Sequence, residues 1–178
     1  MKYESFKKLV MERQACRNFI DKEIKQEKLE KICKLARFTP SACNSQPWKL
    51  YCVSTPEKRE QVCKALQYNG RNSFLSGAKA FIVVSEIPVI LKKDVTARYP
   101  ADFFTKYDIG EIIAYITLTA KSLGIDSCVI GWVDGPKLKD VLEFENSEQS
   151  NLVVALGYSV SPVREKIRKD EKDFIKYV

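Results

Sequence analysis

The sequence contains no histidine among its 178 residues. This absence excludes Ser-His-Asp and Cys-His catalysis, as well as His-ligated zinc and iron sites built from two histidines and a carboxylate. We therefore expect no metal centre and no catalysis by histidine. If the protein is an enzyme, its reactive group is expected to belong to a bound cofactor.

Long hydrophobic runs are missing as well. No stretch approaches the roughly 18 apolar residues that a membrane-spanning helix requires. The first segment, MKYESFKKLVMERQ, carries charges in every short window and so lacks the apolar core of a signal peptide. We therefore expect a cytoplasmic protein that has no membrane partner.

Paired cysteine motifs are also absent, although six cysteines are present. Without a CxxC, the sequence lacks the spacing of a zinc ribbon, a thioredoxin-like site or a four-cysteine iron–sulfur cluster. Most of the cysteines have apolar neighbours, and we expect reduced, buried thiols that pack as small hydrophobic side chains. They are Cys16, Cys33, Cys43, Cys52, Cys63 and Cys128.

The formal net charge of +7 is compatible with a nucleic acid or a phosphorylated ligand as partner. However, the positive residues alternate with acids, as in DKEIKQEKLEKICK and VREKIRKDEKDF. Such alternation is typical of solvated helix faces with i,i+4 ion pairs. No nucleic-acid-binding motif accompanies these charges, so we expect no nucleic-acid partner.

The apolar patterns indicate two helices first, and then strands and helices in alternation. Helices are expected at 3–13, 25–38, 56–66, 108–123 and 136–142, and strands at 48–54, 80–84, 128–133 and 151–156. This order predicts an α+β sandwich, in which a mixed or mostly antiparallel sheet is flanked by helices. No repeat or linker divides residues 1–178, and the charged segment 158–178 is expected to reach toward a partner subunit.

Two of the expected helices carry clear terminal signals. The Thr-Pro-Glu sequence at 55–57 suits the N-cap, the first position and an acidic first turn of one helix. Asp108 and Glu111 resemble a capping box at the start of the other, and Gly124 suits its end. We expect this second helix to be the best buried in the protein. Residues 86–107 before it lack a clear period and are expected to form a functional loop or lid.

Three short segments carry side chains suited to a phosphorylated heterocycle. Arg13 and Arg17 stand four apart near a helix end, where two guanidinium groups can meet one anion. Residues 39–48, TPSACNSQPW, hold small and amide side chains beside two prolines, and amides suit a flat ring with alternating donors and acceptors. Lys166 and Arg168 add two cations after a strand and a turn. Taken alone, each segment has an ordinary explanation: surface ion pairs, a helix-to-strand connection or a solvated basic tail.

Together, the three segments resemble the motifs of the nitroreductase family in order and separation. That family has R-x-S-x-R, then P-S-x-x-N-x-Q-P-W, then G-Y-P followed by K-x-R; this chain has RQACR, PSACNSQPW and GYS followed by KIR. The segments 108–110 and 123–125 resemble the family's long central helix. Two departures stand out. Ala15 replaces the usual serine, which is expected to remove one hydroxyl contact to a phosphate, and Ser159 replaces a common proline.

The resemblance implies a nitroreductase-like three-layer sandwich, one FMN-binding domain over residues 1–178, and a homodimer with FMN at the subunit interface. The cations would hold the FMN phosphate, Gln14 and Asn72 the edge of the ring, and residues 130–132 its face. The other subunit would supply Pro40, Ser41, Ala42 and Asn44. The implied FMN contacts are Arg13, Gln14, Ala15, Arg17, Pro40, Ser41, Ala42, Asn44, Asn72, Ile130, Gly131, Trp132, Lys166 and Arg168.

The implied activity is the ping-pong transfer of two electrons from NADH or NADPH, through the flavin, to a small acceptor such as a nitroaromatic, a quinone or an enone. The flavin carries the chemistry, in agreement with the absence of histidine. Three alternatives stay open: a module that stores or delivers FMN without turnover, a specialised flavin enzyme that dehydrogenates, dehalogenates or cleaves its flavin, and a basic nucleic-acid-binding domain.

Overall fold

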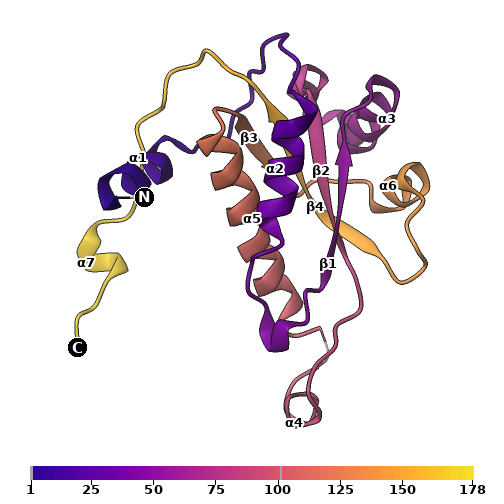
Figure 1. The fold of residues 1–178 in the computed structure, drawn as a ribbon, viewed down its shortest axis with the longest axis vertical. Helices are drawn as coiled ribbons and strands as arrows, with labels where there is room; N and C mark the ends of the chain where they lie inside the picture. The colour runs from indigo at the N-terminus through magenta and orange to yellow at the C-terminus, as the bar shows by residue number, and fades with distance from the viewer. Residues whose placement is uncertain (1, 101) are drawn as a thin grey trace.

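A computed structural model describes residues 2–100 and 102–178. At its centre lies a four-stranded sheet (Figure 1). The strand order is β1-β2-β4-β3, and each neighbouring pair of strands is antiparallel. The strands are β1 (Trp48–Val53), β2 (Ala80–Glu86), β3 (Asp126–Ile130) and β4 (Gln149–Gly157).

Helices cover both faces of this sheet, so the predicted α+β sandwich is confirmed. Helices α2 (Gln26–Ala36) and α5 (Thr105–Ser122) pack on one face, and α3 (Pro56–Leu66) and α6 (Gly135–Leu142) pack on the other (Figure 1). Alternate residues of β2 supply the two cores because side chains of a strand point to opposite faces. Ile82 and Val84 belong to the core under α2 and α5, and Phe81 and Val83 belong to the opposite core.

The two helices with clear terminal signals agree with the sequence only in part. Helix α3 begins at Pro56 with Thr55 at the N-cap position, although the threonine side chain makes no capping hydrogen bond. Helix α5 has nine buried residues against four in α3, so the prediction of its burial is confirmed. Gly124, at φ 73°, ends this helix region as expected. The predicted capping box is wrong, because α5 begins one turn before Asp108.

Two other boundaries also differ from the sequence-based expectation. A strand was expected at 128–133, but the observed strand β3 begins at Asp126 and ends at Ile130. Ile130 pairs with Val153 at the end of the ladder with β4. The expected irregular segment 86–107 includes the end of β2, the short helix α4 (Lys93–Thr96) and the first turn of α5. Ala101 of this segment lies outside the described residues.

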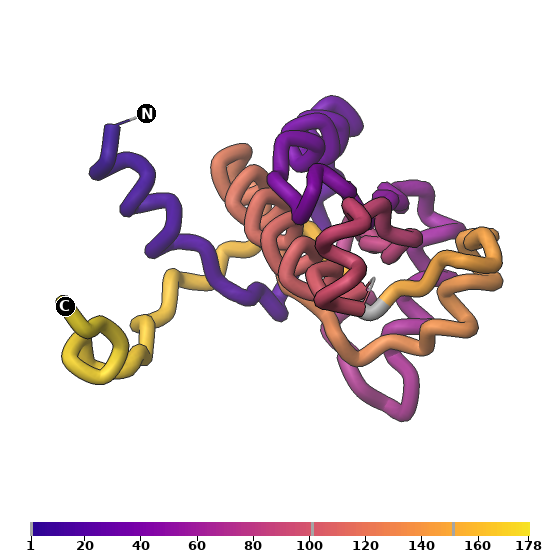
Figure 2. The backbone as a smooth tube through the Cα atoms, turned by 90° about the horizontal axis from the view of Figure 1, so that it is seen from below, coloured from indigo at the N-terminus to yellow at the C-terminus, as the bar shows by residue number. Residues whose placement is uncertain are grey.

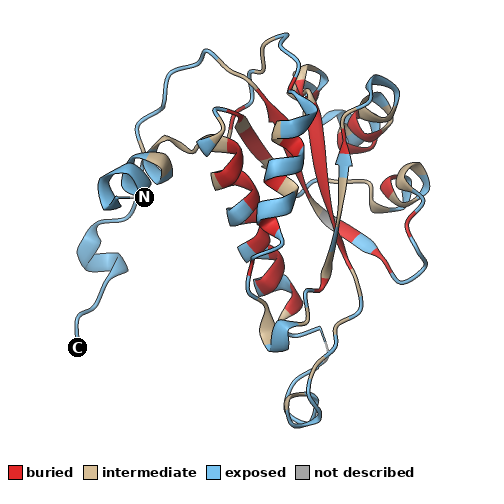
Figure 3. Ribbon diagram, viewed as in Figure 1, coloured by how far each residue is buried: buried red, intermediate tan, exposed pale blue. Residues whose placement is uncertain are grey.

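Helix α1 (Tyr3–Glu12) and the C-terminal segment with the short helix α7 (Glu171–Phe174) both lie away from the two cores (Figures 1 and 2). Helix α1 contacts α5 but buries none of its residues, as its pale colour in Figure 3 shows. The expected apolar face is nevertheless present. Leu9 is half-buried, and Phe6 and Val10 are 47% and 46% exposed.

The six cysteines all carry free thiols, but their burial was predicted correctly only in part. Cys16, Cys63 and Cys128 are buried, and Cys33 is partly buried. Cys43 and Cys52 are exposed, which corrects the prediction for these two residues. Cys43 lies in the short 3-10 turn η1 (Ala42–Asn44), and Cys52 lies on β1, which forms an edge of the sheet.

Candidate functional site

Two segments from opposite parts of the sequence meet at the edge of the sheet beside β3. Ala15 forms an isolated parallel bridge with Ser127 of β3, and the Cys16 amide donates to the Ser127 carbonyl at 2.8 Å. The first segment, 13–17, is thereby fixed to the sheet. Residues 162–168 then run alongside it: the Gln14 side-chain amide donates to the Pro162 carbonyl at 3.1 Å, and Lys166 Nζ donates to the Arg13 carbonyl at 2.8 Å.

A cavity of about 440 Å³ opens between these segments, and its charged groups are mostly cations. We call Arg13, Arg164, Lys166 and Arg168 the cationic cradle. The described residues place no carboxylate within ion-pair distance of any of the four. Glu165 is the acidic residue of the lining. The cradle therefore concentrates positive charge that its described neighbours do not neutralise.

The pKa of Lys166 records this crowding. Burial lowers the pKa of Lys166, and repulsion from Arg13, Arg168 and Arg164 lowers it further. Nearby cations disfavour the charged, protonated form of a lysine, and a bound anion would favour that form again. The cradle is therefore suited to an anionic group, and guanidinium forks suit the oxygens of a phosphate.

Arg17 takes a different direction from the cradle. Its guanidinium lies 6.0 Å from the centre of the Phe74 ring, and it does not line the cavity. Phe74 belongs to the 3-10 turn η3 (Ser73–Gly77), which directly follows Asn72. The structure therefore separates Arg17 from Arg13 and directs it toward the second group of predicted residues.

That second group joins Asn72 to the segment after β3. Asn72 has a left-handed backbone, φ 58°, and its side-chain amide donates to the Leu66 carbonyl at 2.9 Å and the Trp132 carbonyl at 3.4 Å. The Trp132 indole N–H donates to the Tyr68 carbonyl at 3.1 Å, within the 3-10 turn η2 (Tyr68–Gly70). The ring of Trp132 is thus held in place although the residue is 46% exposed.

The edge strand β3 connects the two groups. Ala15 pairs with Ser127 near the start of the strand, and Ile130 ends it, so Gly131 and Trp132 follow directly. Ile130 is buried, whereas Gly131 and Trp132 are exposed. Most of the predicted contacts therefore form one region along β3, from the cradle to Trp132.

The loop 40–47 lies elsewhere in the chain. The loop follows α2, whereas the segment 13–17 precedes that helix. Helix α2 has 11 residues and is therefore about 16 Å long. The structure therefore does not bring Pro40, Ser41, Ala42 and Asn44 to the cradle of the same chain. Figure 1 shows this loop at the lower end of α2 and the start of that helix at the upper end.

The conformation of this loop is strained and well anchored. Cys43, Asn44 and Gln46 have φ values of 54°, 53° and 47°, in the left-handed region that disfavours residues other than glycine. The Ala42 amide donates to both carboxylate oxygens of Asp108, at 3.1 and 3.3 Å. Burial raises the pKa of Asp108, while the Ala42 hydrogen bond acts in the opposite direction. Asp108 of the best-buried helix thus holds the loop.

The segment after β2 extends the same end of the molecule. The Ile90 amide donates to Ser45 Oγ at 2.9 Å, so this segment is fastened to the loop 40–47. Aromatic side chains then gather before α5. Phe103 lies 4.8 Å from Tyr99 and 4.9 Å from Phe104, measured between ring centres. A functional role for 86–107 stays a prediction.

Two features were not anticipated from the sequence. Arg164 is the first; alternate residues of an extended segment share a face, so Arg164 belongs with Lys166 and Arg168, and this spacing was the available signal. Glu148 is the second. Its side chain is 2% exposed and accepts hydrogen bonds from Tyr51 at 2.6 Å, Ser85 at 2.9 Å and Lys49 at 2.9 Å. Burial alone would raise the pKa of Glu148, but these bonds outweigh it and leave the pKa lowered.

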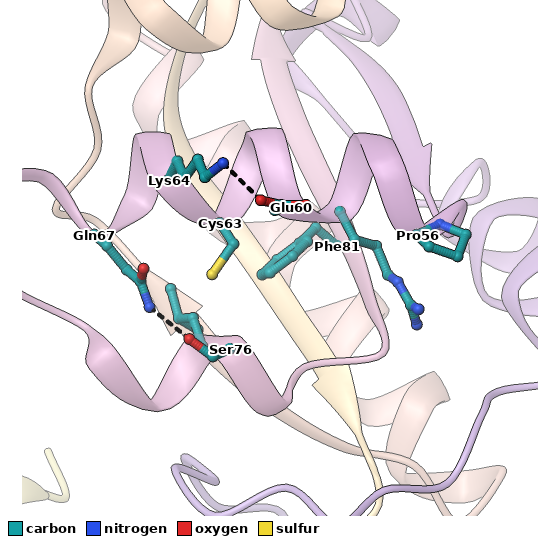
Figure 4. A pocket seen from close by; sticks show the side chains of 9 residues that line it. Pro56, Glu60, Cys63, Lys64, Gln67, Ser76 and Phe81 are labelled. Atoms are coloured by element: carbon teal, nitrogen blue, oxygen red, sulfur yellow. Dashed lines mark hydrogen bonds and ion pairs between the residues drawn. The ribbon is translucent and has the colours of Figure 1, made fainter.

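A separate cavity of about 350 Å³ lies between α3 and η3 (Figure 4). An ion pair between Lys64 and Glu60 and a hydrogen bond between Gln67 and Ser76 border it, and the sulfur of Cys63 points into it. Burial raises the pKa of the Cys63 thiol, which disfavours the reactive thiolate. None of the FMN contacts implied by the sequence is among the described residues that line this cavity.

Among the described residues, no group of three or more Cys, Asp or Glu side chains is arranged to hold a metal ion. In that same part of the chain, no helix is long and apolar enough to cross a membrane.

Comparison with known proteins places this arrangement in context. The model of the Nitroreductase family matches residues 10–68 and 62–158. A protein of Archaeoglobus fulgidus, named as an NADH dehydrogenase/NAD(P)H nitroreductase, is 31% identical over 94% of this chain and 87% of its own length. An oxygen-insensitive NADPH nitroreductase of Helicobacter pylori is 25% identical over 98% of this chain and 97% of its own.

Solved structures share the fold at lower identity. The crystal structure of a nitroreductase family protein from Clostridium difficile 630 superposes with a TM-score of 0.82 at 21% identity, covering 99% of this chain and 98% of the other. An FMN-dependent nitroreductase from Clostridium difficile R20291 superposes with a TM-score of 0.70 at 24% identity, covering 93% and 92%.

Proposed function

Because this chain belongs to the nitroreductase family, we propose that it is an FMN-dependent oxidoreductase that passes two electrons from NADH or NADPH to a small acceptor. Residues 1–178 would form one FMN-binding domain. The observation that carries the proposal is the cationic cradle, which gathers four cations around one cavity without ion-paired carboxylates among the described residues. The relatives named as NAD(P)H nitroreductases, and the solved relative named as FMN-dependent, support it.

The cradle fits the phosphate of FMN. Arg13, Lys166 and Arg168 line the cavity together, and burial followed by repulsion from the neighbouring cations lowers the pKa of Lys166. A phosphate monoester brings about two negative charges at neutral pH and three acceptor oxygens. We propose that these three residues bind the phosphate and that Ala15 adds backbone contact. Arg17 would meet the cofactor nearer its ring, beside Phe74.

The segment beyond β3 fits the flat part of the cofactor. Trp132 is held by its indole hydrogen bond, and Asn72 ties the neighbouring turn to the Trp132 carbonyl. We propose that Ile130, Gly131 and Trp132 lie against the ring and that Asn72 addresses its edge. The Gln14 amide is already bonded to Pro162 and Arg164, so we propose that it acts at the cofactor by fixing the cradle as well as by direct contact.

When bound, the flavin would accept a hydride from the reduced nicotinamide and hand on the electrons, a chemistry that needs little acid–base catalysis by side chains. The chain's own residues bind and orient the cofactor. No side chain is proposed as a catalytic acid, base or nucleophile.

A homodimer would complete the site. Asp108 anchors the loop 40–47, but this loop lies at the far end of α2 from the cradle of its own chain. We propose that Pro40, Ser41, Ala42 and Asn44 contact the FMN of a second copy. Exposed apolar side chains on α1 and the C-terminal segment provide surface for that association, among them Phe6 at 47% and Phe174 at 79% exposure. The site would then depend on the dimer for activity.

The test is an absorption spectrum of the purified protein, before and after anaerobic addition of NADH or NADPH. We expect flavin absorption that bleaches with at least one nicotinamide and returns when a nitroaromatic, a quinone or an enone is added. Light scattering on the same sample should give the mass of a dimer. Bound flavin that neither nicotinamide bleaches would favour storage or delivery of FMN. A protein that stays colourless after incubation with FMN would contradict the proposal.

A further inference from the structure

Arg164 joins the two segments that form the cradle. Its main-chain amide donates to Gln14 Oε1 at 3.0 Å, and its side-chain Nε donates to the same oxygen at 3.3 Å. Its Nη2 donates to the Ala15 carbonyl at 2.7 Å. The Gln14 amide in turn donates to the Pro162 carbonyl. Arg164 is therefore oriented by neutral partners on the segment 13–17, although its residue is exposed.

The charge of Arg164 has no ion-pair partner within the described part of the chain. It lines the same cavity as Arg13, Lys166 and Arg168, and it is one of the cations that lower the pKa of Lys166. Neutral acceptors could have been satisfied by a neutral donor. A cation held here adds repulsion to the cluster, which an anion in the cavity would offset.

The guanidinium also has donors left for that anion. It carries five N–H groups, and the hydrogen bonds seen within the described residues use one on Nε and one on Nη2. The remaining donors, including those of Nη1, belong to a planar group whose orientation the Gln14 and Ala15 bonds have already fixed. Such an oriented fork is suited to phosphate oxygens.

We propose that Arg164 is a further phosphate-binding residue, which makes the cradle select a flavin that carries a phosphate over one that does not. This inference rests on the proposed function and assigns to Arg164 a role beyond the Lys-x-Arg pair. The ligand chemistry is a phosphate monoester on a flavin. The matching ligand without that group is riboflavin, which shares the whole ring system and the ribityl chain.

The experiment compares the dissociation constants of FMN and riboflavin, measured by quenching of flavin fluorescence with the apoprotein. Arg164→Gln should weaken FMN binding about tenfold or more, since a lost charge-assisted hydrogen bond has an effect of this size. Riboflavin binding should change by less than about twofold, because it has no phosphate to lose. Arg164→Lys should lie between wild type and Arg164→Gln, since it keeps the charge but not the fork.

Lys169→Gln is the matched control. It removes one positive charge from the same exposed segment, but Lys169 does not line the cavity. FMN and riboflavin should bind this variant as they bind the wild type. If Arg164→Gln weakened both flavins equally, Arg164 would serve only to hold the segments together, and the inference would be wrong. Unchanged FMN binding in Arg164→Gln would also overturn it.

The outcomes separate this inference from the function on which it rests. If the wild type bound neither flavin, the proposed function would fail first. If the wild type bound FMN and was reduced by a nicotinamide, but Arg164→Gln kept the same ratio of the two constants, only the role of Arg164 would fail.

Discussion

The cationic cradle and the loop 40–47 are proposed to contact the same ligand, yet they are built in opposite ways. The cradle lies on an exposed edge, and its segments are joined by hydrogen bonds that leave like charges facing one another. The loop has no charged residue but an unfavourable backbone, with three left-handed residues that are not glycine. A buried carboxylate of α5 holds it in that shape.

The difference concerns what relieves each kind of strain. A bound anion can relieve the repulsion in the cradle, so ligand binding lowers the electrostatic free energy of the cradle. Backbone strain in the loop is present with or without ligand, and the fold has to offset it permanently. We therefore expect changes in the cradle to alter affinity more than stability, and changes in the loop to alter stability directly.

The largest effect should come from removing two cradle charges, in Arg13→Gln/Lys166→Gln. FMN affinity should fall by about 100-fold or more, since each charge-assisted hydrogen bond contributes roughly 1.5–3 kcal/mol. The free energy of unfolding of the apoprotein should change by less than about 1 kcal/mol, because relief of repulsion offsets the lost hydrogen bond. Fluorescence titration and urea unfolding measure the two quantities. A large loss of apoprotein stability would contradict the contrast drawn here.

Asp108→Ala tests the anchor of the loop. The Ala42 amide loses its acceptor, and the free energy of unfolding should fall by about 2 kcal/mol. Asp108→Asn keeps an oxygen acceptor and should lose less. Urea unfolding checks both variants, with Glu111→Ala as control, because Glu111 is exposed on the same helix. Equal losses for Asp108→Ala and Glu111→Ala would show that the anchor contributes nothing.

Cys43→Gly tests the backbone strain itself. Glycine tolerates φ 54° without a Cβ clash, so the variant should gain about 1 kcal/mol of stability despite its more flexible unfolded chain. Cys43→Ala keeps the Cβ and should gain nothing. Thermal unfolding of the two variants separates the loss of the thiol from the relief of strain. A gain in Cys43→Ala equal to that in Cys43→Gly would assign the effect to the thiol.

The smallest effect concerns pH. Burial and repulsion lower the pKa of Lys166 in the ligand-free protein, and a bound phosphate would raise it again. In the alkaline window between the two pKa values, binding then takes up a proton, so FMN affinity relative to riboflavin falls as pH rises. Titrations with both flavins from neutral pH to about pH 10 measure this slope. The slope should vanish in Lys166→Gln; a wild-type ratio that is constant with pH would refute the linkage.

Much of the fold could be predicted because local signals and burial agreed. The Thr-Pro-Glu signal at 55–57 correctly predicted that α3 begins at Pro56, and the apolar stripe of α5 correctly indicated the best-buried helix. The start of α5 could not be predicted, because Asp108 is of a residue type that often caps helices, but its carboxylate accepts a hydrogen bond from the Ala42 amide instead. That partner is 66 residues away in sequence, beyond the reach of any local pattern.

The candidate site shows the same limit. The sequence suggested that Arg13, Arg17, Lys166 and Arg168 act together; the structure places three of them around one cavity, whereas Arg17 lies by Phe74. It did not suggest Arg164, whose role depends on the Gln14 and Ala15 oxygens across the cavity. Glu148 was missed for a related reason. Glu148 directly precedes β4, and its partners Tyr51 and Ser85 come from β1 and β2, so it becomes a buried acceptor only once the sheet is assembled.

The cradle also has a consequence for the order of events during synthesis. The residues joined by its hydrogen bonds are about 150 positions apart, 150 for Arg164 with Gln14 and 153 for Lys166 with Arg13. All four strands, ending at Gly157, precede the second segment in the chain. While the ribosome has not yet released residues 162–168, the N-terminal segment has no cationic partner to close the cavity. We therefore expect FMN to bind after the sheet has formed. Protein made while flavin is scarce should then fold without the cofactor and bind it later.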